Sequence, residues 1–315
     1  MRTCLMIEGQ EDVRWEHWLA LASACERNGF EALFRSDHYL SVEDRRDRGS
    51  LDAWGTICAL AAVTERIRLG TLVSPVTFRH PSSLAKLAVT ADHISGGRIE
   101  VGMGAGWWEP EHRLYGFPFP ETRTRTAMLA EQLEILRGEW KEGPFSFQGT
   151  HYRIEELDAR PKPVGRPNLI VGGNAGPRSA RLAARWADEY NTVFATPDVC
   201  RERRQAVAEA WADQGRDPET LTFSLMTGCL IGPDRSEVVE RARRLAARRG
   251  DDPAEAEGLL DSVREAWLVG TPTEAIKRLQ GLGEAGVDRV MLQHLLHEDI
   301  EAIELIGREV IPAVR

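Results

Sequence analysis

Short apolar runs rich in β-branched residues alternate with amphipathic helical runs along most of the chain, and this alternation is the feature that most limits the fold. Strands that alternate with helices in this way form parallel sheets built from βα units. We predict eight strands, which begin at Thr3, Ala32, Arg68, Ile99, Leu169, Glu189, Phe223 and Arg289. The sequence therefore predicts an α/β protein with a parallel sheet.

The length of the chain favours closure of this sheet into a barrel. A (β/α)8 TIM barrel needs about 250 residues, and the chain has 315. We expect residues 1–315 to form a single barrel domain, with the remaining length in loop insertions near residues 141–167 and 249–267. A doubly wound open sheet is the competing fold.

Charge and hydrophobic patterning limit the partners. A net charge of −9 argues against a nucleic-acid partner, and no apolar run is long enough for a membrane span. The first residues turn acidic too early for a secretory signal, so we expect a cytoplasmic protein that binds a small molecule. The most basic segment, Arg241 to Gly250, is predicted to be a solvated helix face. The five cysteines are widely separated, which indicates reduced thiols.

In a barrel of this kind, the functional residues follow the carboxyl ends of the strands. Asp37 and His38 occupy such a position after the second predicted strand. A histidine exchanges protons near neutral pH, and an adjacent acid can orient it or hold its charge. The alternative is a turn-capping aspartate beside an ordinary surface histidine.

The fourth and fifth strands end in glycine-rich segments. The spacing of Gly102, Gly104 and Gly106 does not match a dinucleotide fingerprint, and these glycines could instead let a planar ring approach the backbone. Nearby Glu109, Glu111 and His112 lack the H-x-H pair that metal-dependent barrel hydrolases place on a strand, so no metal site is predicted.

The segment after the fifth strand has the character of a phosphate-binding loop. Gly172, Gly173 and Gly176 leave backbone N–H groups uncovered, and Pro177 begins a helix whose positive dipole end faces the same loop. A flexible connection with no ligand is the alternative.

Taken together, these segments resemble the luciferase-like monooxygenase superfamily, in particular its oxidoreductases that use the deazaflavin coenzyme F420. The resemblance runs over most of the chain and is specific in the order and spacing of its motifs. They are Ser36-Asp37-His38, residues 68–98, residues 102–120, residues 170–191 and residues 267–293.

The resemblance implies a hydride-transferring oxidoreductase in which Asp37 contacts the coenzyme ring and His38 transfers a proton. It also implies a non-proline cis peptide at Leu72-Val73, and homodimers. The other implied coenzyme contacts are Ser74, Ala105 and Gly106 at the ring, and Gly172, Gly173, Ala175 and Gly176 at the phosphate.

Two positions depart from the sugar-phosphate dehydrogenases of the superfamily. Trp107 stands where they have a catalytic glutamate, and Pro110 stands where they have an asparagine. We therefore keep two alternatives open: a monooxygenase that uses reduced FMN and oxygen, and a coenzyme-binding protein with little catalysis. We also expect Tyr39, Trp107 and Trp108 to shape the substrate pocket. Arg79, Arg178 and Arg181 are expected to form a basic rim that meets the acidic tail of F420.

Overall fold

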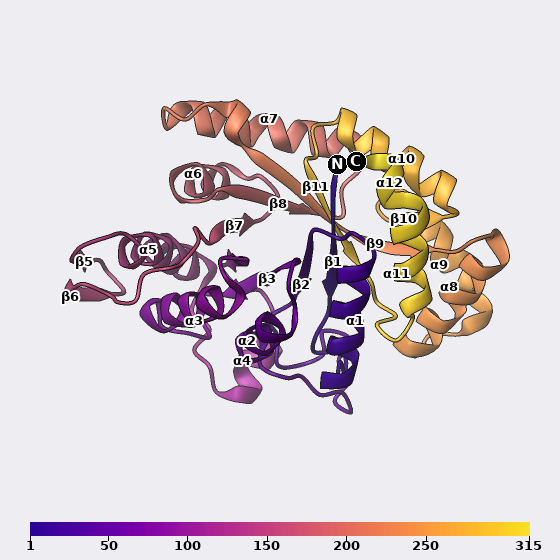
Figure 1. Ribbon diagram of the computed structural model, residues 1–315, viewed down its shortest axis with the longest axis horizontal. Helices are drawn as coiled ribbons and strands as arrows, with labels where there is room; N and C mark the ends of the chain where they lie inside the picture. The colour runs from indigo at the N-terminus through magenta and orange to yellow at the C-terminus, as the bar shows by residue number, and fades with distance from the viewer.

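The computed structural model describes residues 1–315 and contains a closed parallel barrel surrounded by helices (Figure 1). Strand β9 pairs with both β8 and β11, and this pairing closes the ring, so the open doubly wound sheet is excluded. All eight predicted strands are present. In barrel order they are β1 (Arg2–Ile7), β2 (Ala32–Arg35), β3 (Arg68–Pro75), β4 (Ile99–Gly104), β7 (Asn168–Gly172), β8 (Glu189–Val193), β9 (Thr222–Ile231) and β11 (Arg289–Gln293).

Helices connect the strands and cover the outside of the barrel (Figure 1). Several begin with a proline at their first position, which fixes the backbone angle without losing a needed hydrogen bond. The helices are α1 (Trp15–Arg27), α2 (Ala53–Val63), α3 (Pro81–Ser95), α4 (Glu109–Tyr115), α5 (Thr122–Trp140), α6 (Pro177–Trp186), α7 (Pro197–Asp213), α8 (Arg235–Arg249), α10 (Pro272–Glu284), α11 (Ile300–Leu305) and α12 (Ile311–Val314).

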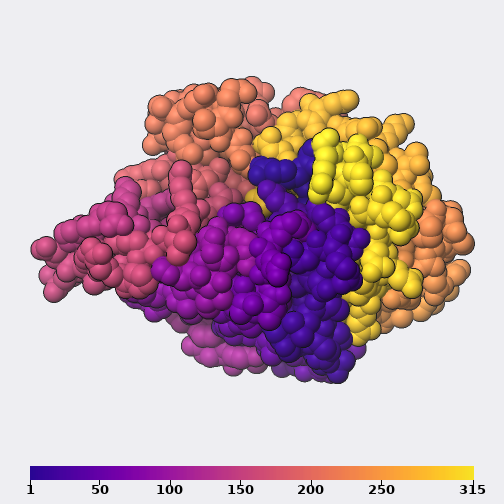
Figure 2. Space-filling view, viewed as in Figure 1, coloured from indigo at the N-terminus to yellow at the C-terminus, as the bar shows by residue number.

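The expected loop insertions contain regular structure. Residues 141–167 include an antiparallel hairpin of β5 (Phe145–Gln148) and β6 (Arg153–Leu157), which projects from one side of the molecule (Figure 2). The second region contains helix α9 (Ala256–Val263), and the short strand β10 (Leu268–Gly270), which pairs with the end of β9, follows it. Propensity did not reveal these elements because both segments are short and mostly exposed.

The barrel interior is apolar in its middle and ionic at its amino end. Arg289, at the start of β11, donates hydrogen bonds of 2.9 and 2.6 Å to the buried carboxylates of Glu100 and Glu189. These groups fill the amino end, and an apolar layer lies above them. Its buried members are Cys4, Met6, Ala32, Phe34, Leu72, Ile170, Met226 and Met291.

The basic segment of α8 is not a simple solvated face. Arg241 is buried and donates to the Asp299 carboxylate at 2.9 Å, while Arg249 reaches a cavity at the carboxyl end of the barrel. None of the helices is both long and apolar enough to span a membrane. All five cysteines are free thiols, as predicted.

Candidate active site

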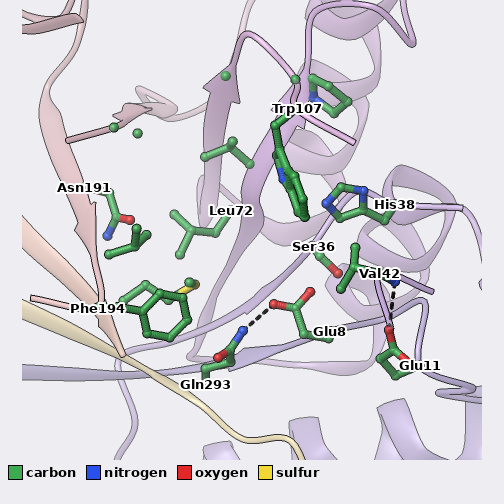
Figure 3. A pocket seen from close by; sticks show the side chains of 18 of the residues that line it. Glu8, Glu11, Ser36, His38, Val42, Leu72, Trp107, Asn191, Phe194 and Gln293 are labelled. Carbon is green, nitrogen blue, oxygen red and sulfur yellow. Dashed lines mark hydrogen bonds between the residues drawn. The ribbon is translucent and has the colours of Figure 1, made fainter. Parts of the chain in front are cut away.

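A cavity of about 830 Å³ opens at the carboxyl ends of the barrel strands (Figure 3). Residues at or after all eight barrel strands contribute to its wall. A cavity of this size is at the upper end of those that hold small ligands and cofactors. The predicted site residues that line it are His38, Leu72, Val73, Ala105, Gly106, Gly172 and Gly173.

His38 and Glu111 form an acid–base pair at the cavity wall. Nδ1 of His38 lies 2.7 Å from Oε1 of Glu111, and the other Glu111 oxygen accepts the N–H of Tyr39 at 3.0 Å. A carboxylate only accepts, so Nδ1 carries the hydrogen, and Nε2 makes no hydrogen bond within the protein. Burial by itself lowers the pKa of His38, but the hydrogen bond and charge of Glu111 outweigh it and raise that pKa above its ordinary value.

Asp37 does not line the cavity. Its side chain is buried, and Oδ2 accepts hydrogen bonds from Ser74 at 2.6 Å and from Arg79 at 2.5 Å. Its second oxygen, Oδ1, is also buried and has no protein partner. Asp37 therefore holds the loop after β2 against the end of β3, and one of its oxygens has no protein partner.

The same contacts correct the expected basic rim at Arg79. The Arg79 guanidinium donates to Asp37, to the Asp52 carboxylate at 2.7 Å and to the Tyr39 hydroxyl at 3.0 Å. Both of its terminal nitrogens are engaged by these partners, and Arg79 does not line the cavity. Arg178 and Arg181 on α6 are exposed, and neither forms an ion pair.

The end of β3 forms one wall of the cavity. The Leu72-Val73 peptide bond is cis, as the resemblance implies, and both side chains line the cavity; Figure 3 shows Leu72 at this wall. Ser74 lies behind them and accepts the indole N–H of Trp54 at 3.1 Å. The residues that follow β4, Ala105 and Gly106, continue the wall.

The glycines of β4 have a packing role in addition to the predicted one, and Gly104 also lines the cavity. A Cβ at Gly102 would collide with the Thr71 carbonyl oxygen, and a Cβ at Gly104 would lie 2.7 Å from a Val73 methyl group. Gly102 and Gly104 are thus required for the close approach of β4 to β3. Gly106 lines the cavity and has a left-handed backbone with φ of 81°.

The loop after β7 is held partly by the protein itself. The Gly173 N–H donates to the Asn191 carbonyl at 3.0 Å, and the Ala175 N–H donates to the Tyr190 hydroxyl at 2.7 Å. Gly172 and Gly173 line the cavity, whereas Ala175 and Gly176 do not. Helix α6 follows without a side-chain cap at Gly176, so its first N–H groups remain available to an anion.

Acidic side chains line the side of the cavity formed by the segments after β1 and β2. Glu11 and Glu43 are both paired with Arg48, and Glu43 also lies 3.3 Å from Arg249. Glu8 differs because it has no cationic partner. Its two oxygens accept amide hydrogens from Gln293 at 2.6 Å and from Gln10 at 2.9 Å.

Aromatic side chains form much of the remaining wall, but not all the predicted ones. Trp107 lines the cavity and meets the His38 ring edge-on with centroids 5.9 Å apart. Tyr39 and Trp108 do not reach it; the Tyr39 hydroxyl is bound to Asp52 and Arg79. Phe194 and Trp267, which the sequence analysis missed, stack with centroids 6.4 Å apart.

Sequence reasoning also missed the polar residues Glu8, Glu111 and Gln293. The sequence suggests Glu111 only as a metal ligand, although it lies three residues after Trp107-Trp108 and the glycine-rich turn. Glu8 directly follows the first barrel strand, and Gln293 is the final residue of the last one. Their position at the carboxyl ends of strands could have identified them as site residues.

Outside the cavity, His17, His297 and Glu298 have potential ligand atoms within 4.8 Å of one another. In both histidines Nδ1 faces an N–H donor, the Arg14 amide at 3.2 Å and the Arg248 guanidinium at 3.2 Å. The Arg14 guanidinium also lies 3.5 Å from Nε2 of His17. Positively charged donors therefore face both histidines, and this group is poorly arranged for a metal cation.

The closed barrel, with an acid–base pair in a large cavity at the carboxyl ends of its strands, places the protein in the class of (β/α)8-barrel enzymes. Comparison with known families makes this specific. The chain belongs to the luciferase-like monooxygenase family, whose model matches residues 3–289.

Similar proteins use two kinds of coenzyme. The chain is 28% identical to the FMNH2-dependent dimethylsulfone monooxygenase of Pseudomonas putida, over 94% of this chain and 86% of that protein. It is also 28% identical to the F420-dependent hydroxymycolic acid dehydrogenase of Mycobacterium tuberculosis, over 98% of this chain and 88% of that protein.

A solved structure shows the same fold. An F420-dependent secondary alcohol dehydrogenase, in complex with an F420-acetone adduct, superposes with a TM-score of 0.85 at 24% identity, covering 100% of this chain and 99% of that one. The family and its relatives therefore support an oxidoreductase with a flavin or deazaflavin coenzyme.

Proposed function

We propose that the protein is an F420-dependent oxidoreductase that transfers a hydride between the deazaflavin and a small organic substrate. The observation that carries this proposal is the His38–Glu111 pair, 2.7 Å apart, at the wall of a cavity large enough for a ring and a substrate. It provides a proton donor or acceptor where a hydride transfer to or from a carbonyl carbon needs one.

The residues present fit the coenzyme. Leu72 and Val73 offer an apolar wall for a planar ring, with Ala105 and Gly106 beside them and Ser74 behind. Asp37 lies behind this wall and its buried Oδ1 has no protein partner, so a hydrogen bond from a ring N–H to Asp37 would require side chains of the wall to move.

We assign the coenzyme phosphate to the loop of Gly172, Gly173, Ala175 and Gly176. Two of its N–H groups are held by Asn191 and Tyr190, so the donors would come chiefly from Gly176 and the first turn of α6. Arg178 and Arg181 are exposed without ion pairs and could meet the acidic tail of F420.

When bound, F420 would accept or supply the hydride. In the direction of alcohol oxidation, neutral His38 takes the hydroxyl proton on Nε2, and the Glu111 carboxylate stabilises the resulting imidazolium through Nδ1–H. In the reverse direction the imidazolium returns that proton to the oxygen. The Trp107 ring packs edge-on against the His38 ring and so helps to hold it in place.

The second candidate is a monooxygenase that uses reduced FMN and oxygen. The relative from Pseudomonas putida, similar over most of its length, favours this possibility. A coenzyme-binding protein without catalysis would have no need of the His38–Glu111 pair. We further propose that the protein is a cytoplasmic homodimer. Light scattering on the purified protein would measure its mass in solution and so test the dimer.

The proposal is tested by turnover in the absence of oxygen. The purified protein is mixed with oxidised F420 and a panel of primary and secondary alcohols, and the loss of F420 absorbance is followed. We expect an alcohol-dependent loss that the His38→Ala variant lacks. No reaction with F420, together with oxygen-dependent product formation from FMNH2, would favour the monooxygenase.

A further inference from the structure

The carboxylate of Glu8 is the one acidic group of the cavity wall that is paired with neither an arginine nor a histidine. Glu11 and Glu43 share Arg48, and Arg249 approaches Glu43, while Glu111 holds His38. Glu8 forms no ion pair, although its charge is near enough to His38 to raise the pKa of that ring. A carboxylate that a ligand buries without a counter-charge destabilises the complex.

The surroundings hold this carboxylate in place. Gln293, the last residue of β11, donates to Oε1 at 2.6 Å, and Gln10 donates to Oε2 at 2.9 Å. Figure 3 shows Glu8 extending toward the cavity between Gln293 and Ser36. Each carboxylate oxygen has a second lone pair, so Glu8 can still accept from a ligand.

The apolar part of the wall points to the same kind of ligand. Trp107, Phe194 and Trp267 line the cavity, and Trp267 already has the Arg249 guanidinium 5.5 Å from its ring centre. Aromatic faces attract cations, and their area favours an apolar or ring-bearing body.

We propose that Glu8 binds a protonated amine on the substrate, whose body is apolar or aromatic. This deepens the proposed function and rests on it only for the reacting group, which would lie beside His38. Glu8 is then a residue that determines specificity, with Gln293 and Gln10 as positioning residues.

Binding of two matched probes tests this proposal. Benzylamine is a cation at neutral pH, and benzyl alcohol is a neutral molecule of nearly the same shape. Each is titrated into the protein with and without F420, and the quenching of tryptophan fluorescence is followed. We expect benzylamine to bind at least ten times more tightly, with a preference that weakens as salt is added.

The variants identify the group responsible. Glu8→Gln should abolish the preference for benzylamine, and Glu8→Asp should keep most of it. The control is Glu109→Gln, which removes an exposed carboxylate near the cavity and should change nothing. Equal affinity of the two probes in the natural protein, or an unchanged preference in a folded Glu8→Gln variant, would overturn the proposal.

These outcomes are separate from those of the coenzyme proposal. Failure of F420 to bind would count against the proposed function while the probe comparison without coenzyme still decides the role of Glu8. If Glu8→Gln does not fold, the comparison of Glu8→Asp with the natural protein and the salt dependence decide it.

Discussion

Nδ1 of His38 lies 2.7 Å from Oε1 of Glu111, and this contact joins the loop after β2 to helix α4, which is 73 residues further along the chain. It fixes the tautomer of the imidazole and leaves Nε2 for proton exchange. The proposed chemistry depends on this pair.

Replacing His38 by alanine should reduce turnover about 10²–10⁴-fold, the usual effect of removing a positioned acid–base group. The affinity for the coenzyme should change little. Steady-state kinetics and a binding titration measure the two quantities. His151→Ala, in the exposed turn of the hairpin, is a suitable control. Turnover equal to that of the natural protein would show that His38 has no catalytic role.

Replacing Glu111 by glutamine should shift the pH dependence of turnover. The Glu111 carboxylate raises the pKa of His38 against the opposing effect of burial, so its loss should lower the pKa of that ring. The limb of the pH–rate profile that reports His38 should move to lower pH. An unchanged limb would assign it to another group.

The same pair makes stability depend on pH. The pKa of His38 is higher in the folded protein than its ordinary value of 6.5, so the pair stabilises the fold fully below that pH. The contribution is lost as pH rises through the raised folded pKa. The difference in unfolding free energy between the natural protein and Glu111→Gln should therefore shrink in alkaline solution. A difference that grows with pH would contradict this sign.

Replacing Arg79 should lower the stability of the fold and leave the affinity for the coenzyme unchanged. Arg79→Leu leaves the buried Asp37 carboxylate without its cation, which typically costs about 3–5 kcal/mol. Denaturant unfolding measures the loss, and Arg79→Lys should recover part of it. If Arg79→Lys instead weakens F420 binding while stability is unchanged, the arginine does face the coenzyme.

Tyr190→Phe should loosen the loop assigned to the phosphate. The hydroxyl accepts the buried Ala175 N–H at 2.7 Å, and leaving that group unpaired costs about 1–3 kcal/mol. The affinity for the coenzyme should therefore fall in Tyr190→Phe. Ser179→Ala removes the 3.0 Å contact between the two hydroxyls and the bond of Ser179 to the Gly176 carbonyl, but it leaves the Ala175 N–H paired and should have a smaller effect. Equal affinity in natural protein and Tyr190→Phe would separate this loop from the coenzyme.

Some features of the fold and site can be predicted from the sequence and others cannot, and the reason is physical. The strands and the position of His38 follow from local periodicity, which a single sequence carries. The partners of each polar group do not, because they depend on contacts between distant segments. Gln293 meets Glu8 across 285 residues, and Arg79 meets Asp37 across 42. For that reason the sequence predicts Arg79 at the rim of the cavity, whereas in the structure it is bound to Asp37 behind the wall.

The glycines of β4 also have neighbours that the sequence alone does not reveal. The sequence indicates that the end of β4 must be free of side chains, but it does not say what comes close. The close neighbours of Gly102 and Gly104 are the carbonyl of Thr71 and the side chain of Val73 on β3. Gly104 and Gly106 also lie at the cavity wall, whereas Gly102 does not.

The affinity of the protein for the two coenzymes tests the central claim most directly. The protein without coenzyme is titrated with F420 and with FMN, followed by fluorescence at low and moderate salt. We expect F420 to bind at least ten times more tightly, a difference of about 1.4 kcal/mol, and its binding to weaken with salt because of its acidic tail. Tighter binding of FMN would contradict the assignment of F420.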